Sequence, residues 1–197
     1  MRIAIAACAL ALFGTSALAE TPVNNDAQAL EALKLFASCA VQRTPDGARK
    51  ILALDPNGEA YQKASSAYAR GHSMCLRGNS KLKFASLPFA GFLAEALLAR
   101  EAAVSTGDTG AKPVSTENWV EAVGACVAVQ KPAEVSSVFA TVPGSDAETA
   151  ALNPTGEALR GCIREGQTVA LNRAAVRAMY ALGAYRLSHP IQSKSEG

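Results

Sequence analysis

The apolar positions in the first part of the chain recur at helical spacing. Over residues 26–42 they fall three and four positions apart, which is the pattern of a helix that buries one side. These positions are Leu30, Leu33, Phe36, Ala37 and Ala40. Alanine is abundant along the chain and β-branched residues are sparse, which favours helices over strands. We therefore expect an all-α fold.

A cap and two prolines mark the second predicted helix. Thr44 is a residue type that caps helix ends, and Pro45 fits the first helical position, where an amide hydrogen has no partner to lose. Pro56 follows the last turn and prevents the helix from continuing. We expect a short helix between these residues.

Two further helices complete this part. Asn57 is expected to cap a helix that carries Cys75 and ends before Gly78. A short extended piece at residues 82–84 then leads to a fourth helix over residues 87–101.

The fourth helix is unusually apolar. Residues 87–99 are apolar except for Gly91 and Glu95. This stretch is too uniformly apolar for a surface helix and too short for a membrane span. We expect a central core helix between the two parts of the chain. The alternative is a surface for self-association or partner binding, because an exposed apolar patch of that size is otherwise a liability.

The second part of the chain follows the same plan. Thr116 is expected to cap a helix that contains Trp119, and Pro132 opens the next helix. Ser145 and Glu148 have the spacing of a capping box, in which two side chains bind the free backbone amides at a helix start.

A proline divides the following helix. Pro154 is expected to break it near Asn153, which gives two short pieces. An extended piece at residues 169–171 precedes the last helix, which covers residues 173–187 and is capped by Asn172. Arginines on one side of this helix predict that it is more exposed than its apolar counterpart in the first part.

The two parts share the positions of their cysteines and prolines. The same spacing separates Cys39 from Cys75 and Cys126 from Cys162. An ungapped alignment on the cysteines brings further residues together: Pro45 with Pro132, Ile51 with Val138, Pro56 with Pro143 and Arg77 with Arg164. This favours a tandem duplication that gives two similar four-helix units. The alternative is two unrelated helical segments that share a spacing by accident.

The first residues have the pattern of an export signal. Residues 1–19 begin with a positive charge, continue with an apolar run at 3–13 and end in a small-x-small motif, so we expect cleavage before Glu20. A retained anchor helix would need about 20 apolar residues. Lipid modification at Cys8 would leave too little apolar chain ahead of it to engage an export channel.

Export changes the interpretation of the cysteines. Signal removal takes one of the five and leaves an even number for an oxidising compartment. There is no C-x-x-C motif for redox exchange or a zinc knuckle. Tight turns place the ends of the first and third helices of each unit at one level, so of the three pairings allowed we expect Cys39–Cys75 and Cys126–Cys162.

The predicted organisation is linear. It comprises a signal peptide at 1–19, a first helical repeat at 20–102, a linker or long loop at 103–115, a second helical repeat at 116–188 and a flexible tail at 189–197. We expect no transmembrane span after signal cleavage and a periplasmic or secreted protein.

One histidine lies close to a cysteine. His72 and Cys75 share a helical face, as a nucleophile or metal pair would. The counterpart of His72 in the second part is Leu159, and the remaining histidine, His189, lies in the tail. A disulfide-bonded Cys75 is neither a nucleophile nor a thiolate ligand. We expect a structural or solvent-exposed His72.

A basic cluster is the candidate for anion or partner binding. Arginines on two adjoining helices can clamp a carboxylate or phosphate through paired hydrogen bonds, although most such runs are the solvated face of a helix. The candidate residues are Arg77, Arg160, Arg164, Arg173 and Arg177.

Composition and motifs do not support nucleic-acid binding, catalysis or metal binding. With 19 basic and 17 acidic residues the net charge is +2, which gives no sequence-wide reason to bind nucleic acid. The sequence has no G-x-S-x-G motif, no Gly-rich phosphate loop and no metal-ligand cluster. We therefore expect no cofactor or metal and assign no catalytic residue.

The paired pattern C-A-V-Q-R-T-P to M-C-L-R and C-V-A-V-Q-K-P to G-C-I-R resembles a group of uncharacterised secreted bacterial proteins with tandem two-cysteine helical units. The resemblance covers residues 28–187 and rests on spacing and apolar pattern. It implies export and helical repeats, and it assigns no functional residue.

Together these features predict an exported, disulfide-stapled protein of the cell envelope that works by binding or structural association, with an unidentified protein as a partner. One alternative is a periplasmic enzyme with a noncontiguous active site, which a deep cleft holding a desolvated carboxylate would favour. Another is an inhibitor or immunity-type partner of a secreted toxin, which a neighbouring toxin gene would support.

Overall fold

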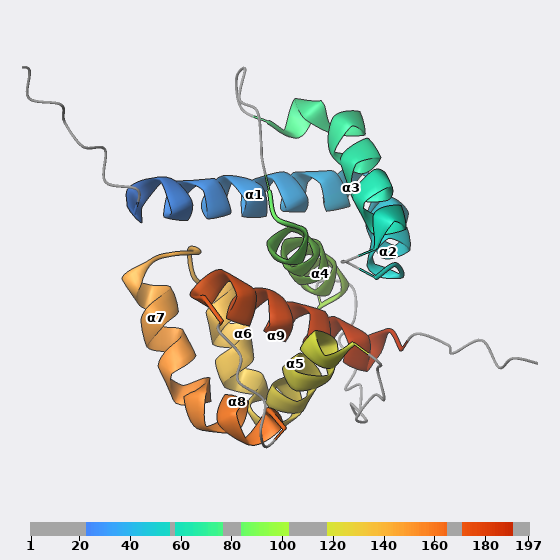
Figure 1. The fold of residues 1–197 in the computed structure, drawn as a ribbon. Helices are drawn as coiled ribbons and strands as arrows, with labels where there is room; N and C mark the ends of the chain where they lie inside the picture. The colour runs from blue at the N-terminus through green and yellow to red at the C-terminus, as the bar shows by residue number, and fades with distance from the viewer. Residues whose placement is uncertain (1–22, 56–57, 77–83, 103–117, 165–170, 191–197) are drawn as a thin grey trace, which may run out of the picture.

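The structure, a computed structural model, describes residues 23–55, 58–76, 84–102, 118–164 and 171–190. Within these ranges the regular elements are all helical, which confirms the all-α prediction (Figure 1). In chain order they are α1 (Val23–Arg43), α2 (Pro45–Leu52), α3 (Glu59–Gly71), η1 (Ser73–Cys75), α4 (Ser86–Ala102), α5 (Trp119–Gln130), α6 (Pro132–Ala140), α7 (Asp146–Leu152), η2 (Asn153–Thr155), α8 (Gly156–Cys162) and α9 (Arg173–Ser188).

Several predicted features lie outside the described residues. They are the signal peptide at 1–19, the linker at 103–115, Pro56, Asn57, Arg77, Gly78, Thr116, most of the two extended pieces and the end of the tail. These stay predictions. We call residues 23–102 the first half and residues 118–188 the second half.

The helix boundaries at three prolines agree with those predicted from the sequence. Pro45 and Pro132 each occupy the first turn of a helix, α2 and α6. At Pro154 the chain changes from α7 to the short turn η2 and then to α8, which confirms the predicted break. Asn172 caps α9 by accepting a hydrogen bond from the amide of Ala175 at 2.9 Å.

Two other helix starts differ from prediction. The side chain of Asn118, rather than Thr116, caps α5 by accepting from the amide of Val120, so the helix begins at Trp119. Gly58 occupies the cap position of α3 in place of Asn57. Asparagine is a strong capping residue, which explains why α5 starts after Asn118. At both helix starts the apolar pattern alone does not decide between neighbouring cap candidates.

The disulfide pairing agrees with the sequence prediction. Cys39 bonds to Cys75 and Cys126 bonds to Cys162, with Cα–Cα distances of 5.8 and 5.9 Å. The first bond ties the C-terminal part of α1 to the end of η1, and the second ties α5 to the end of α8.

Helices α4 and α9 form the centre of the molecule. In Figure 1, α4 is seen nearly end-on between α1 and α9, and α9 separates α4 from α5 and α6. α4 is buried as predicted, with Phe89, Leu93 and Leu97 all fully inaccessible. The expectation that the last helix is more exposed is wrong, because α9 buries both Met179 and Leu182 between α4 and α5.

The main hydrophobic core extends across both halves. Ala181, Leu182 and Tyr185 of α9 belong to the same buried cluster as the core residues of α1, α2 and α4. A smaller cluster around Val127 and Tyr180 lies within the second half. The two halves therefore share one core through α9, and their origin by duplication stays a prediction.

No helix in the described part of the chain is long and apolar enough to cross a membrane.

Candidate functional site

A cavity of about 590 Å³ opens between the two halves. Its apolar lining includes Phe92 and Leu98 of α4, Val135 and Phe139 of α6, and Leu187 of α9. A volume of this size is in the range of sites that take a small organic molecule.

Small side chains make the space. α4 places Ala96, Ala99 and Ala102 along the cavity at helical intervals, and Ala128 of α5 and Ala184 of α9 also line it. A larger side chain at these positions would fill the space between the helices, so the alanine-rich composition has a local consequence beyond helix propensity.

Charged groups occur at one part of the lining, where Lys34 of α1 meets Glu95 of α4. The ammonium of Lys34 donates to the backbone oxygens of Phe139 at 2.8 Å and Thr141 at 3.0 Å, and it lies 2.8 Å from Oε1 of Glu95. An ammonium has three hydrogens, so these three acceptors occupy it fully. Lys34 thereby joins the first half to the end of α6 in the second.

Arg177 of α9 lies behind Glu95 and is 1% exposed. Its Nε and Nη2 donate to the two carboxylate oxygens of Glu95 at 2.9 and 2.8 Å, which is the paired geometry that suits a guanidinium and a carboxylate. Its Nη1 donates to Glu148 at 2.8 Å and to the hydroxyl of Thr141 at 3.1 Å. Nη2 also donates to the backbone oxygen of Phe139.

The environment keeps Arg177 charged. Burial lowers the pKa of its guanidinium, but the hydrogen bonds and charge of Glu95, followed by those of Glu148, outweigh burial and leave the pKa raised. We call Lys34, Glu95, Glu148 and Arg177 the ionic floor. It holds two cations and two carboxylates, so its charges balance.

A second buried ion pair lies within the second half at the other end of α9, and a hydrogen bond from its arginine joins the two halves. Arg186 donates from Nε and Nη2 to the two oxygens of Glu121 on α5, both at 2.8 Å. Nη2 also donates to the backbone oxygen of Leu52 in the first half. Within the described residues no buried side-chain nitrogen or oxygen lacks a hydrogen-bond partner.

The structure divides the predicted basic cluster. Arg177 is not available to an anion, because it is buried and bound to Glu95 and Glu148. Arg173 is exposed at the start of α9 and donates to the hydroxyl of Thr149 at 2.6 Å. The remaining described members, Arg160 and Arg164, are exposed at the end of the second half, and anion binding by them stays a prediction.

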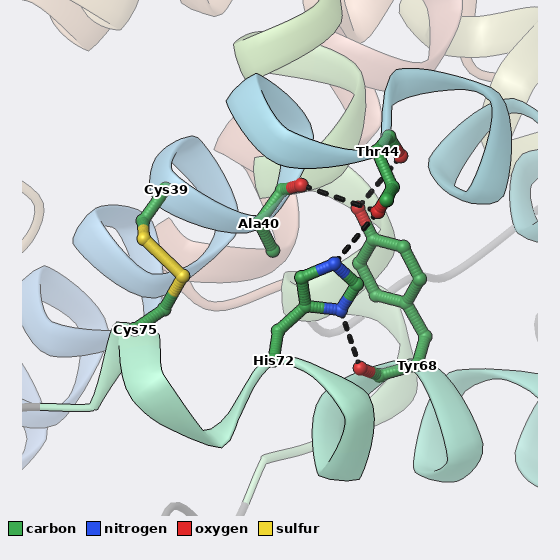
Figure 2. The surroundings of a disulfide bond; sticks show 6 residues. All are labelled: Cys39, Ala40, Thr44, Tyr68, His72 and Cys75. Carbon is green, nitrogen blue, oxygen red and sulfur yellow. Dashed lines mark hydrogen bonds between the residues drawn. A yellow bond between two sulfur atoms is a disulfide. The ribbon is translucent and has the colours of Figure 1, made fainter.

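His72 has a structural position (Figure 2). Its Nδ1 faces the backbone oxygen of Tyr68 at 2.7 Å, and Nε2 faces the hydroxyl of Thr44 at 2.7 Å. A carbonyl only accepts, so Nδ1 carries a hydrogen, and Nε2 pairs with the hydroxyl of Thr44, which also lies 3.5 Å from the backbone oxygen of Ala40. Thr44 occupies the cap position of α2, yet its hydroxyl makes no capping bond there and lies near His72 instead. The ring thus links the end of α3 to the start of α2, beside the disulfide of Cys75.

Sequence reasoning missed most of the ionic floor. The usable signal was an acidic residue inside an apolar stretch. Glu95 is such a residue within residues 87–99 of α4, and Glu121 is one within α5. Such residues are rarely buried without a partner. The two arginines that pair with them both lie on α9.

Among the described residues, no group of three or more histidine, cysteine, aspartate or glutamate side chains is placed to hold a metal ion. Comparison of the chain with protein-family models, with curated proteins and with solved structures gives no match.

Proposed function

We propose that this protein is an exported module of the cell envelope that works by binding, and that the cavity between its halves is the binding site. The observation that carries the proposal is the cavity itself, an apolar space of about 590 Å³ whose walls come from both halves. An apolar cavity with a few polar groups is the usual form of a small-molecule site.

The disulfides support export. Both are formed within their own half, and disulfides persist in oxidising compartments outside the cytoplasm. Such bonds fit a periplasmic or extracellular protein. Together with the signal pattern at residues 1–19 they favour delivery to the cell envelope. The measurement that checks this is the intact mass of the protein recovered from the producing cell, which should correspond to a chain that begins at Glu20.

The contacts of Glu95 favour binding over catalysis. A buried carboxylate beside a cavity is a feature of acid–base enzymes. Here Arg177 takes both oxygens of Glu95, and Lys34 also contacts Oε1. Although Glu95 belongs to the cavity lining, both oxygens of its carboxylate are thus bound by cations of the protein.

Titration with N-phenyl-1-naphthylamine, a neutral dye that fluoresces in apolar surroundings, tests the proposal on the oxidised chain beginning at Glu20. We expect saturable binding of one dye per chain. Ala99→Phe places a ring in the cavity at an exposed wall position and should weaken dye binding at least tenfold. Ala60→Phe is the matched control, because Ala60 is exposed on α3 away from the cavity.

The free energy of unfolding of both variants separates blocked binding from misfolding. Equal dye affinity in Ala99→Phe and the original protein would contradict the assignment of the cavity, and so would an absence of saturable binding in the original protein.

A further inference from the structure

We propose that the cavity selects uncharged ligands, apolar chains that end in a hydroxyl or a similar neutral group, and that Lys34 is the residue that sets this preference. The inference rests on the proposed function and adds the chemical class of the ligand. It starts from the charge balance of the ionic floor.

The floor offers no charge to a ligand. Lys34 and Arg177 together balance Glu95 and Glu148. The donors of both cations are used by these carboxylates, by the hydroxyl of Thr141 and by the backbone oxygens of Phe139 and Thr141. A ligand carboxylate in the cavity would find no free N–H group, and a ligand ammonium would find no free carboxylate. Either one would lose its hydration without gaining a counter-ion, which opposes binding.

A neutral polar group has suitable partners instead. Three serines belong to the cavity lining: Ser38 on α1, Ser136 on α6 and Ser188 on α9. A hydroxyl both donates and accepts a hydrogen bond, so it pairs with the hydroxyl of an alcohol at no cost in charge. The apolar walls of Phe92 and Leu187 then accommodate the chain.

Lys34 is the member of the ionic floor that can be removed most simply. Its side chain is 26% exposed, against 2% for Arg177 and 1% for Glu148. Without it, Arg177 still holds both oxygens of Glu95 and still donates to the backbone oxygens of Phe139 and Thr141.

Substitution of Lys34 should therefore change ligand selection. Lys34→Ala leaves two carboxylates against one cation, and it empties the position that lay 2.8 Å from Glu95 and within reach of two backbone oxygens. Those three acceptors form a site for a primary ammonium. We expect the variant to bind alkylamines that the original protein rejects.

Displacement of N-phenyl-1-naphthylamine by 1-decanol, decanoate and decylamine at neutral pH, below their aggregation concentrations, tests the proposal. Decanol should displace the dye from the original protein at a concentration at least tenfold below either charged ligand. In Lys34→Ala, decylamine should gain at least tenfold while decanoate gains nothing. Lys50→Ala removes an exposed lysine of α2 and is the matched control, which should behave as the original protein.

The outcomes separate the two proposals. Saturable dye binding with equal displacement by decanol and decanoate would overturn the selectivity and leave the cavity as a site. Absence of dye binding would overturn both. If Lys34→Ala loses its helical circular dichroism, Lys34→Gln replaces it, and no gain for decylamine in that folded variant would refute the role of Lys34. A second copy of the chain in the cavity, seen as a dye-excluding dimer by light scattering, would also overturn the proposal.

Discussion

Gly124 of α5 and Gly183 of α9 face each other where the two helices cross. A Cβ atom added to Gly183 would lie 2.6 Å from the Cα of Gly124, and one added to Gly124 would overlap the backbone oxygen of Met179. Because these neighbours are backbone atoms, no rotation of a side chain can make room. The close crossing allows α9 to pack against α5 on one side and α4 on the other.

Replacement of either glycine by alanine should separate the two helices. We expect Gly124→Ala or Gly183→Ala to lower the free energy of unfolding by about 3 kcal/mol or more, the upper end for overpacking, measured by urea denaturation. Gly161→Ala is the control, because no atom lies within 4 Å of its added Cβ. That variant should be unchanged or more stable by up to about 1 kcal/mol. Equal effects at Gly161 and Gly183 would contradict the crossing.

Loss of the Arg177 side chain should be among the most damaging changes in the second half. Arg177→Met leaves Glu95 and Glu148 buried with one cation fewer, which is expected to cost about 3 to 5 kcal/mol in the free energy of unfolding. Arg173→Met removes an exposed arginine of the same helix and should change stability by less than about 0.5 kcal/mol. A loss below about 1 kcal/mol for Arg177→Met would show that the buried carboxylates do not depend on it.

The two disulfides should act independently. Cys75→Ser opens the bond that spans 36 residues in the first half, and the chain-entropy estimate for such a loop is about 4 kcal/mol. Peptide mapping without reduction should still find Cys126 bonded to Cys162 in this variant. Loss of both bonds, or a new bond between the halves, would contradict independent pairing.

High pH should unfold the protein through its tyrosines. Burial raises the pKa of all four, Tyr61, Tyr68, Tyr180 and Tyr185, above the usual tyrosine value of about 10. The folded state therefore keeps protons that the unfolded state releases. The stabilisation is complete below about pH 10 and is lost as the pH rises further, by up to about 1.4 kcal/mol per pH unit for each tyrosine.

The measurement is the ultraviolet absorbance of tyrosinate, followed together with helical circular dichroism. We expect the two signals to change together, because the hydroxyls become accessible on unfolding. Tyrosinate absorbance that develops near pH 10 while the helical signal stays constant would contradict the buried positions of these side chains.

Local features of the fold were accessible to sequence reasoning. The break at Pro154 depends on one residue that cannot continue a helix, and the cap at Asn172 depends on a side chain and the amide three residues later. The disulfide pairs followed from helix order and equal spacing. Each of these inferences needs only the local sequence or the order of the helices within one half of the chain.

The burial of α9 was not accessible in the same way. Arg177 and Arg186 are polar by any local measure, so the helix was expected to be more exposed. They are buried because Glu95 and Glu121 lie on two other helices and face them from opposite ends. The residue pattern of α9 alone does not reveal that carboxylates on other helices neutralise its arginines.

The position of α9 also has a consequence for the order of folding. Arg177 meets Glu95 across 82 residues of chain, and Arg186 reaches the oxygen of Leu52 across 134. The ribosome therefore releases α9 after the helices of the first half that it contacts, and contacts of such long range form slowly. The residues of α1, α2 and α4 that pack against Ala181, Leu182 and Tyr185 therefore stay uncovered until α9 is made.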